Sequence, residues 1–427
     1  MSIKKVSGSI LGLAVVVVGV WLGGSVYLGR TVTAAFKTQL AKSPNQGAVR
    51  MVNLQHQQGL LSSNGAFELR FNDLGADAGT GAQALALQVE YRMVNLLLPA
   101  SSMRFEWKVK PIGPAVAEIN RLFGSEIVLD GKGAVGYGGG LVSSLSMPEL
   151  VMRQGQDLMQ ISPSSGHVSW GKPAFTLEWK TDRITVRGEG QALDVRGVTA
   201  AADINNINRG TGTMLFGIDK LSTSDSSAEG LSLATTMSER ADRIDIQVVP
   251  KIKSYNVAGQ KLRDLELELN IKDLDASSIE TISTVAQDSD DFQNLTADEK
   301  NRTRSAVQSM LAKGFSVLIP RLSGQLGEGT FTGDMQVEVK KSDVVPPAKF
   351  SVASRVAASG QWQAKGKAID NTQKRLAVML GIATLTPDGL KASFEFADGK
   401  LKANGRSYDL SGSLEVIDAE VNAFLTP

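Results

Sequence analysis

The sequence predicts a mainly β protein with a few helices, an α+β fold in which a single N-terminal transmembrane helix precedes a large antiparallel, curved β-sheet body. Two observations carry this prediction. Apolar and polar residues alternate with period 2 over most of the chain, which is typical of antiparallel strands that bury one face. In addition, one uncharged apolar segment near the N-terminus is long enough to cross a bilayer.

The uncharged segment lies between Lys5 and Arg30. Its stretch Ile10–Leu28 is close to the ~20 residues of a spanning helix and exceeds the ~7–15 of a signal-peptide core. We therefore expect an uncleaved membrane anchor. A cleaved signal peptide is the alternative, because Gly23 and Ser25 are small enough for its cleavage site. The side chains that we expect in the span include Ile10, Leu13, Val16, Val20, Trp21 and Tyr27.

Two further expectations concern this anchor. A short positive flank before a single apolar segment is the usual layout of exported proteins, so we expect the N-terminus inside and the body outside. Small residues four positions apart let two helices approach closely, which makes helix pairing through the span a hypothesis. Glycine is also common in membrane helices that do not pair. The residues with this spacing are Gly8, Gly12, Gly19 and Gly23.

Period-2 alternation predicts strands throughout the body. Such runs are explained by a sheet with one face in contact with water and one face buried. The tryptophans at strand positions (Trp107, Trp170 and Trp179) are interpreted as core residues. The pair Asp398-Gly399 between two apolar runs predicts a two-residue hairpin turn. The clearest runs are Phe67–Phe71, Leu85–Met93, Met103–Val109, Phe175–Trp179, Ile244–Val248, Leu265–Ile271, Met335–Val339 and Leu390–Phe396.

Helices interrupt the strands at a few places. Residues 275–314 lack the strand pattern and divide at the acidic stretch Asp288–Asp291. The second half begins with the capping box Thr296 and Glu299 and ends at Gly314. Two more helices are predicted over residues 367–380 and 414–424.

These elements predict four regions. The membrane anchor takes residues 1–30 and a short helical connector takes 31–50. A β-rich region follows over 51–274, and an α+β region over 275–427 continues the same body.

Composition excludes several classes of function. The 45 Lys and Arg balance 44 Asp and Glu, which leaves no bulk charge for nucleic acid. The chain has no cysteine and only two histidines, His56 and His167. Disulfides, thiol nucleophiles and Cys-based or all-His metal sites are therefore excluded. We expect no catalytic, cofactor-binding or metal-binding residues.

Three short motifs have chemical interpretations that their contexts do not favour. Gly131–Gly136 fits the dinucleotide string G-x-G-x-x-G, but Tyr137 and three glycines follow instead of a helix start, so turn or bulge glycines are predicted. Ser169–Lys172 fits S-x-x-K, but Pro173 and a strand follow, which prevents the helical serine–lysine arrangement. The acidic stretch at 288–291 lacks the glycine and terminal glutamate of a calcium loop.

The layout resembles the YdgA-like proteins of Gram-negative bacteria. Three segments carry the resemblance: Trp-x-Gly-Gly-x-x-Tyr-x-Gly at Trp21–Gly29, His56-x-x-Gly-x-x-Ser-Ser63, and the stretch from Thr384 to Gly405. One departure is Val94–Pro99, which reads VNLLLP where many members have a His-Gly-Pro turn. The resemblance implies anchoring in the bacterial inner membrane with the bulk of the chain in the periplasm. It implies no activity, because the family is of unknown function.

We therefore expect a non-enzymatic cell-envelope protein that acts as an interaction module or homodimer through its β body. The alternative is that the sheet binds an apolar ligand or lipid in a groove, and an enzyme is a third hypothesis. Expected partners are the membrane, a second copy or an envelope protein, and no nucleic acid. Val89 separates the first two hypotheses: it is core if something covers its strand, and lines a groove if nothing does.

Overall fold

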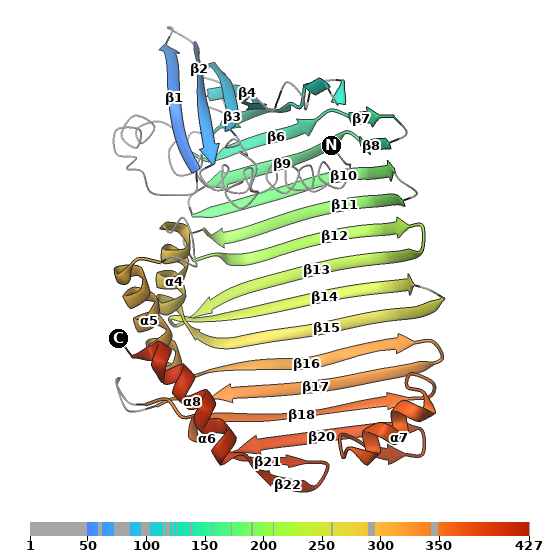
Figure 1. Cartoon of the computed structure of the whole chain (residues 1–427). Coiled ribbons are helices and arrows are strands. Elements are labelled where there is room, and N and C mark those ends of the chain that lie inside the picture. Colours follow the sequence, from blue (N-terminus) through green and yellow to red (C-terminus); the bar gives the residue numbers. More distant parts are fainter. Residues whose placement is uncertain are drawn as a thin grey trace. The chain divides into compact units, whose positions relative to one another are not determined.

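In the computed structural model of the chain, antiparallel strands dominate and a few helices accompany them (Figure 1). The structure describes residues 49–426 with gaps, the longest of which cover 72–85, 95–102, 289–294 and 343–348. Two compact units are present. Within the described part of the chain, unit 1 comprises residues from 49–210 with 287–288, and unit 2 comprises residues from 211–286 with 295–426. The predicted mainly β fold with few helices is confirmed.

Unit 1 is an antiparallel sheet. Its strands pair in the order β1, β2, β3, β4, β5, β6, β9, β10 and β11, and the β7–β8 hairpin joins β10 through β8. The strands are β1 (Val49–Gln58), β2 (Ser62–Phe71), β3 (Ala86–Val94), β4 (Met103–Ile112), β5 (Leu129–Val135), β6 (Leu141–Met147), β7 (Leu150–Gln154), β8 (Asp157–Ile161), β9 (Ser164–Gly171), β10 (Ala174–Gly188) and β11 (Gln191–Asn206).

Unit 2 is also an antiparallel sheet. Its strands pair in the order β12 to β18, then β20, β21 and β22, with short β19 beside β20. They are β12 (Thr211–Thr223), β13 (Ser226–Arg240), β14 (Arg243–Val257), β15 (Gln260–Asp275), β16 (Phe315–Leu326), β17 (Gly329–Val339), β18 (Val356–Lys365), β19 (Thr384–Thr386), β20 (Gly389–Ala397), β21 (Lys400–Ala403) and β22 (Arg406–Asp409).

The predicted turns and helices of unit 2 form. Asp398 and Gly399, with φ of 50° and 74°, connect β20 to β21, as their dipeptide predicts. Thr296 and Glu299 form the expected capping box, and Gly314 ends that helix at φ 70°. The helices are α4 (Ala276–Asp288), α5 (Ala297–Lys313), α6 (Val352–Arg355), α7 (Asn371–Met379) and α8 (Ser411–Leu425).

The apolar side of unit 1 is filled with side chains. Its largest cluster is built from Trp170, Phe175 and Leu177, which are 8%, 3% and 3% exposed. Trp107 and Trp179 pack against this cluster. The interpretation of the three tryptophans as core is therefore confirmed.

The first two glycines of the G-x-G-x-x-G string lie in a strand, which corrects the prediction of turn or bulge glycines for these two positions. Gly131 and Gly133 are residues of β5. A Cβ at Gly131 would come within 2.6 Å of the Trp107 ring, and one at Gly133 within 2.4 Å of the Phe105 ring. These positions require glycine because the aromatic rings of β4 lie directly over them.

Val89 is part of the core of unit 1. Its side chain is 4% exposed and clusters with Phe67, Leu69 and Leu87 from β2 and β3. For this strand the packed-core alternative is therefore correct, and the groove hypothesis has to rest on other strands.

Candidate functional site

Strand register places apolar side chains on one face of the unit 2 sheet. Register partners share a face and side chains alternate along each strand, so the pairs assign every position. Phe216 pairs with Leu233, which pairs with Pro250. We call this side the apolar face. Its members include Met214, Phe216 and Ile218 of β12, Leu231, Leu233 and Met237 of β13, Ile246, Val248, Pro250 and Ile252 of β14, Leu265, Leu267, Leu269 and Ile271 of β15, Val317, Ile319 and Leu322 of β16, Met335 and Val337 of β17, Trp362 of β18, and Phe394 of β20.

The opposite face is polar and several of its charges are paired. Glu266 accepts from Lys251 at 3.0 Å and from Arg321 at 3.3 Å. The bond from Lys251, aided by Arg321, holds the pKa of Glu266 below its usual range. Glu268 accepts from Asn270 and Gln247, both at 2.9 Å, and these bonds likewise lower its pKa. This face is therefore suited to water, and the apolar face is the side that needs a cover.

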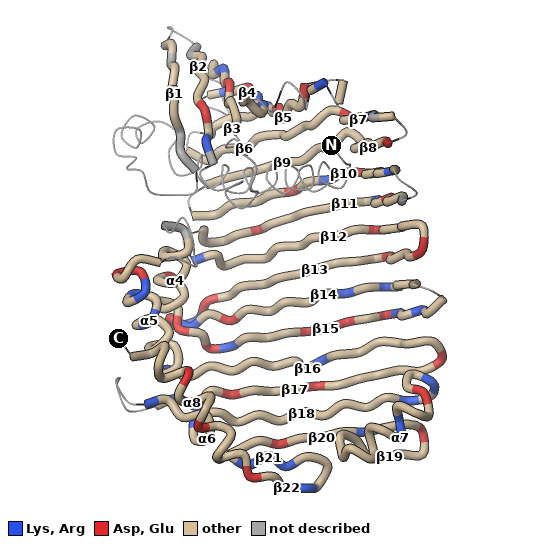
Figure 2. Tube along the Cα trace, in the orientation of Figure 1, with Lys and Arg blue, Asp and Glu red and all other residues tan. Residues whose placement is uncertain are grey.

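The middle of the apolar face is exposed. Met214, Phe216 and Leu233 are 48%, 44% and 42% exposed, and Leu322 on β16 is 36% exposed. Figure 2 shows β12 and β13 largely without charge along their middle. Scattered apolar residues on a surface are ordinary, but a continuous apolar surface marks a binding site or an interface.

Helices cover this face only toward the strand ends. At one end, α4 and α5 place Ile279 and Met310 against Ile244 and Leu274 of β14 and β15. At the same end, α8 contributes Leu425 to a cluster with Val339 of β17. At the other end of β18 and β20, Ala377 of α7 packs with Trp362 and Leu390. Figure 1 shows the helices of unit 2 gathered at the strand ends.

The end cover at α5 is fixed by polar contacts. Arg243 donates to the carbonyl oxygens of Lys313 at 3.0 Å and Gly314 at 3.2 Å, which satisfies the C-terminal end of α5. Asn422 of α8 accepts from the Phe350 amide at 2.8 Å and donates to the Phe350 carbonyl at 2.7 Å. These contacts hold the helices at the end of the sheet, and the middle of the apolar face is left without a helical cover.

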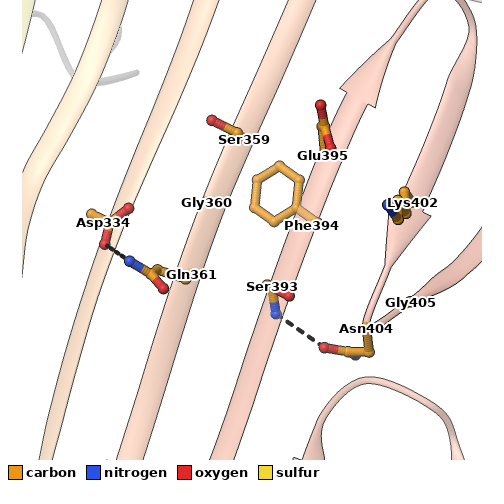
Figure 3. Close-up of a pocket in the computed structure, with 10 residues that line it drawn as sticks. All are labelled: Asp334, Ser359, Gly360, Gln361, Ser393, Phe394, Glu395, Lys402, Asn404 and Gly405. Atoms are coloured by element: carbon orange, nitrogen blue, oxygen red, sulfur yellow. Dashed lines mark hydrogen bonds between the residues drawn. The ribbon is translucent and has the colours of Figure 1, made fainter.

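A hollow lies between β17, β18, β20 and the β21–β22 turn (Figure 3). Its volume is about 400 Å³. Two hydrogen bonds join polar groups of its lining: Gln361 donates to Asp334 at 2.9 Å, and the Ser393 amide donates to Asn404 at 3.0 Å. The lining contains no histidine and no nucleophile–base pair. We therefore interpret this hollow as part of the packing between these strands.

Most of the residues singled out from the sequence lie outside the described part of the chain. The predicted span residues and the Gly8, Gly12, Gly19 and Gly23 set lie outside the described residues, as does the connector except for its last two residues, which begin β1. Ser169 lies on β9, where its hydroxyl is 2.6 Å from that of Thr176, and His167 is exposed on the same strand. The side chain of His56 is outside the described set.

Two observations concern the described residues alone. None of their helices has both the length and the apolarity needed to cross a membrane. Among the same residues, no three acidic, histidine or cysteine side chains gather in a way that could hold a metal ion.

Sequence reasoning missed several exposed residues of the apolar face. Met214 and Phe216 precede the nearest recognised run, and Leu322 follows the bulge of β16 at which the pattern shifts. The available signal was the large number of one-faced strands in a chain with few helices to cover them.

The fold and this face define a mainly antiparallel β protein in which one apolar sheet face is covered at its ends and exposed in its middle. The chain belongs to DUF945, a family of bacterial proteins of unknown function, whose family model matches residues 3–411. No curated protein and no solved structure matches the chain.

Proposed function

We propose that the protein holds the acyl chain of a lipid against the apolar face of unit 2. The observation that carries this proposal is the row of Phe216, Leu233 and their neighbours, which is apolar, continuous across strands and more than 40% exposed at both named residues. Each methylene group that leaves water for such a surface contributes about 0.8 kcal/mol, so a chain of many methylenes gains more than a compact ligand.

The size of the face fits an extended chain. Neighbouring strands lie about 4.8 Å apart, so the seven spacings from β12 to β20 reach about 34 Å. One leaflet of a bilayer is about 15 Å of hydrocarbon, half of the ~30 Å core. An acyl chain laid across four or five strands would therefore find apolar contacts along its whole length. Lys220 and Glu229, which lie on this face near the end of β12, pair with each other at 3.2 Å, and the middle of the face is apolar. Recognition would therefore be for the chain and not for a headgroup.

The location of the protein completes this proposal. The Ile10–Leu28 segment and the similarity to YdgA-like proteins support an anchor in the bacterial inner membrane, with the body in the periplasm. An anchored body of this kind has lipid within reach.

The interaction-module hypothesis has less support in unit 2. Its edge strand β22 is only four residues long and carries Arg406 and Asp409. Short, charged edge strands discourage pairing with a second sheet. Self-association through the apolar face is nevertheless an outcome that the experiment below distinguishes.

The test uses a photo-reactive amino acid, p-benzoylphenylalanine, in the full-length chain in living cells. It replaces Phe216 on the apolar face or, as the matched control, Leu215, which is 49% exposed on the polar face of the same strand. We expect lipid adducts at Phe216 and few at Leu215. Adducts of the chain with itself or with another protein at Phe216, without lipid, would overturn the proposal in favour of a dimer or a protein partner.

A further inference from the structure

The segment formed by α7, the following turn and β19 exposes an unusual number of large apolar side chains. Met379, Leu385, Leu380 and Ile382 are 74%, 68%, 59% and 55% exposed. Leu376 and Val378 are 50% and 41% exposed. We call these six residues the apolar tip. They lie within ten positions of one another, on one short segment.

The inner side of this segment is made of small residues. Ala377 and Ala383 pack on Leu390, and Ala383 is 3% exposed. A surface helix normally buries its large apolar residues and exposes its small or polar ones. Here α7 packs the half-buried Ala377 toward Leu390 and exposes leucine and methionine. Packing within unit 2 therefore does not account for the six large side chains.

The tip is held in place by defined contacts. Asp370 and Gln373 form a capping box at the start of α7. At its end, Gly381 has φ 73°, and the Asn404 side chain donates to the Gly381 carbonyl at 2.8 Å. The exposed residues are thus presented on a fixed support rather than on a loose loop.

Cations and a tyrosine border the tip. A Cβ added at Gly381 would be 3.5 Å from Nη1 of Arg406 and 4.0 Å from the Tyr408 hydroxyl. Tyr408 is 42% exposed, and Arg375 lies beside Leu376 on α7. Within the described part of the chain, neither Arg375 nor Arg406 has a carboxylate partner in an ion pair. An apolar centre bordered by arginine and tyrosine matches a membrane surface, where guanidinium groups lie at the anionic headgroups.

We propose that the apolar tip inserts into the surface of a phospholipid bilayer that contains anionic lipids. The two arginines favour a surface with negative headgroups, because a guanidinium group binds phosphate, and the six aliphatic or methionine side chains between them would enter the hydrocarbon. This contact is separate from the acyl-chain site on the apolar face and does not depend on it.

The absence of cysteine from the chain makes a direct test possible. An environment-sensitive fluorophore is attached to the cysteine of the full-length Met379→Cys variant. The labelled protein is reconstituted in vesicles of phosphatidylcholine and phosphatidylglycerol whose lipids carry a quencher in the acyl chain. Empty vesicles of the same composition are then added, so that the labelled position can also contact a second bilayer. We expect the fluorophore to be quenched, and several-fold less so in phosphatidylcholine alone. The control is Val142→Cys, an apolar position of β6 that is 56% exposed.

Charge reversal gives the second arm of the test. Arg375→Glu with Arg406→Glu, both on exposed positions, is expected to reduce quenching at position 379 several-fold while the thermal unfolding curve stays unchanged. Quenching equal to that at the Val142 position in both kinds of vesicle would overturn the proposal. A blue shift that grows with protein concentration and shows no quenching would overturn it too, in favour of self-association through the tip.

Discussion

Lys313 and Asp275 form an ion pair with Nζ and Oδ1 2.5 Å apart, which joins helix α5 to the end of strand β15. Asp275 is 2% exposed, whereas Lys313 is 46% exposed. Burial alone would raise the pKa of Asp275, but hydrogen bonds from Lys313, Ser278 and Ser277 outweigh it and hold the pKa well below its usual range. The pair fixes the helical end cover to the sheet, beside the exposed middle of the apolar face.

Replacing Lys313 with methionine should destabilise unit 2. The change leaves the buried Asp275 carboxylate with only its serine partners, and an incompletely satisfied buried charge costs about 1–3 kcal/mol. The measurement is urea unfolding of the purified full-length chain. The matched control is Lys340→Met, which removes an exposed pair with Asp398 at 3.6 Å and should cost about 0–1 kcal/mol. Equal effects of the two changes would contradict the role given to the Asp275 pair.

The same pair predicts a dependence of stability on pH. Because the folded-state pKa of Asp275 lies below its ordinary value of 3.8, the stabilisation is complete above that value and is lost as pH falls below it. The stability difference between the wild type and Asp275→Asn should therefore shrink between about pH 5 and about pH 2. Unfolding curves of both proteins over this range provide the measurement. A difference that stays constant would show that Asp275 does not titrate in this way.

Gly131 and Gly136 belong to one sequence string but have different surroundings, which gives a second comparison. A Cβ at Gly131 would meet the Ser144 carbonyl oxygen and the Trp107 ring, whereas one at Gly136 would be 3.7 Å from its nearest neighbour. Gly131→Ala should cost about 1–3 kcal/mol by overpacking, and Gly136→Ala should be close to neutral. Thermal unfolding of both variants tests this. A neutral Gly131→Ala would contradict the close packing of β4 on β5.

Local elements could be predicted because their determinants are neighbours in the sequence. The capping box of Thr296 and Glu299 satisfies backbone groups within three residues of itself, and Asp398-Gly399 specifies its turn without help from the rest of the chain. The alternation of apolar residues likewise predicted which side of each strand avoids water.

What covers that side could not be predicted in the same way. Val89 and Leu233 both lie in period-2 runs, yet Val89 is 4% exposed and Leu233 is 42% exposed. Period 2 records only that one face is apolar, because the pattern arises within a strand, whereas cover is supplied by distant segments. The helix over 367–380 is likewise predictable from its composition. The exposure of Leu376 and Met379 is not predictable, because it depends on which distant segments pack against that helix.

The contrast between a covered and an exposed apolar position leads to the last prediction, which compares Val89→Glu with Phe216→Glu. At Val89 a carboxylate would be buried among Phe67 and Leu87, at a cost of several kcal/mol against a total stability of about 5–15 kcal/mol. At Phe216, 44% exposed, the carboxylate reaches water and unit 2 should stay folded. Thermal unfolding and limited proteolysis of the purified proteins should show loss of the cooperative transition of unit 1 for Val89→Glu alone. Lipid adducts, formed from a photo-reactive residue at Leu233, should disappear in the Phe216→Glu background because a charge next to the chain is unfavourable. A near-normal melt for Val89→Glu would refute the packed core of β2 and β3, and unfolding of Phe216→Glu would refute the exposed apolar face.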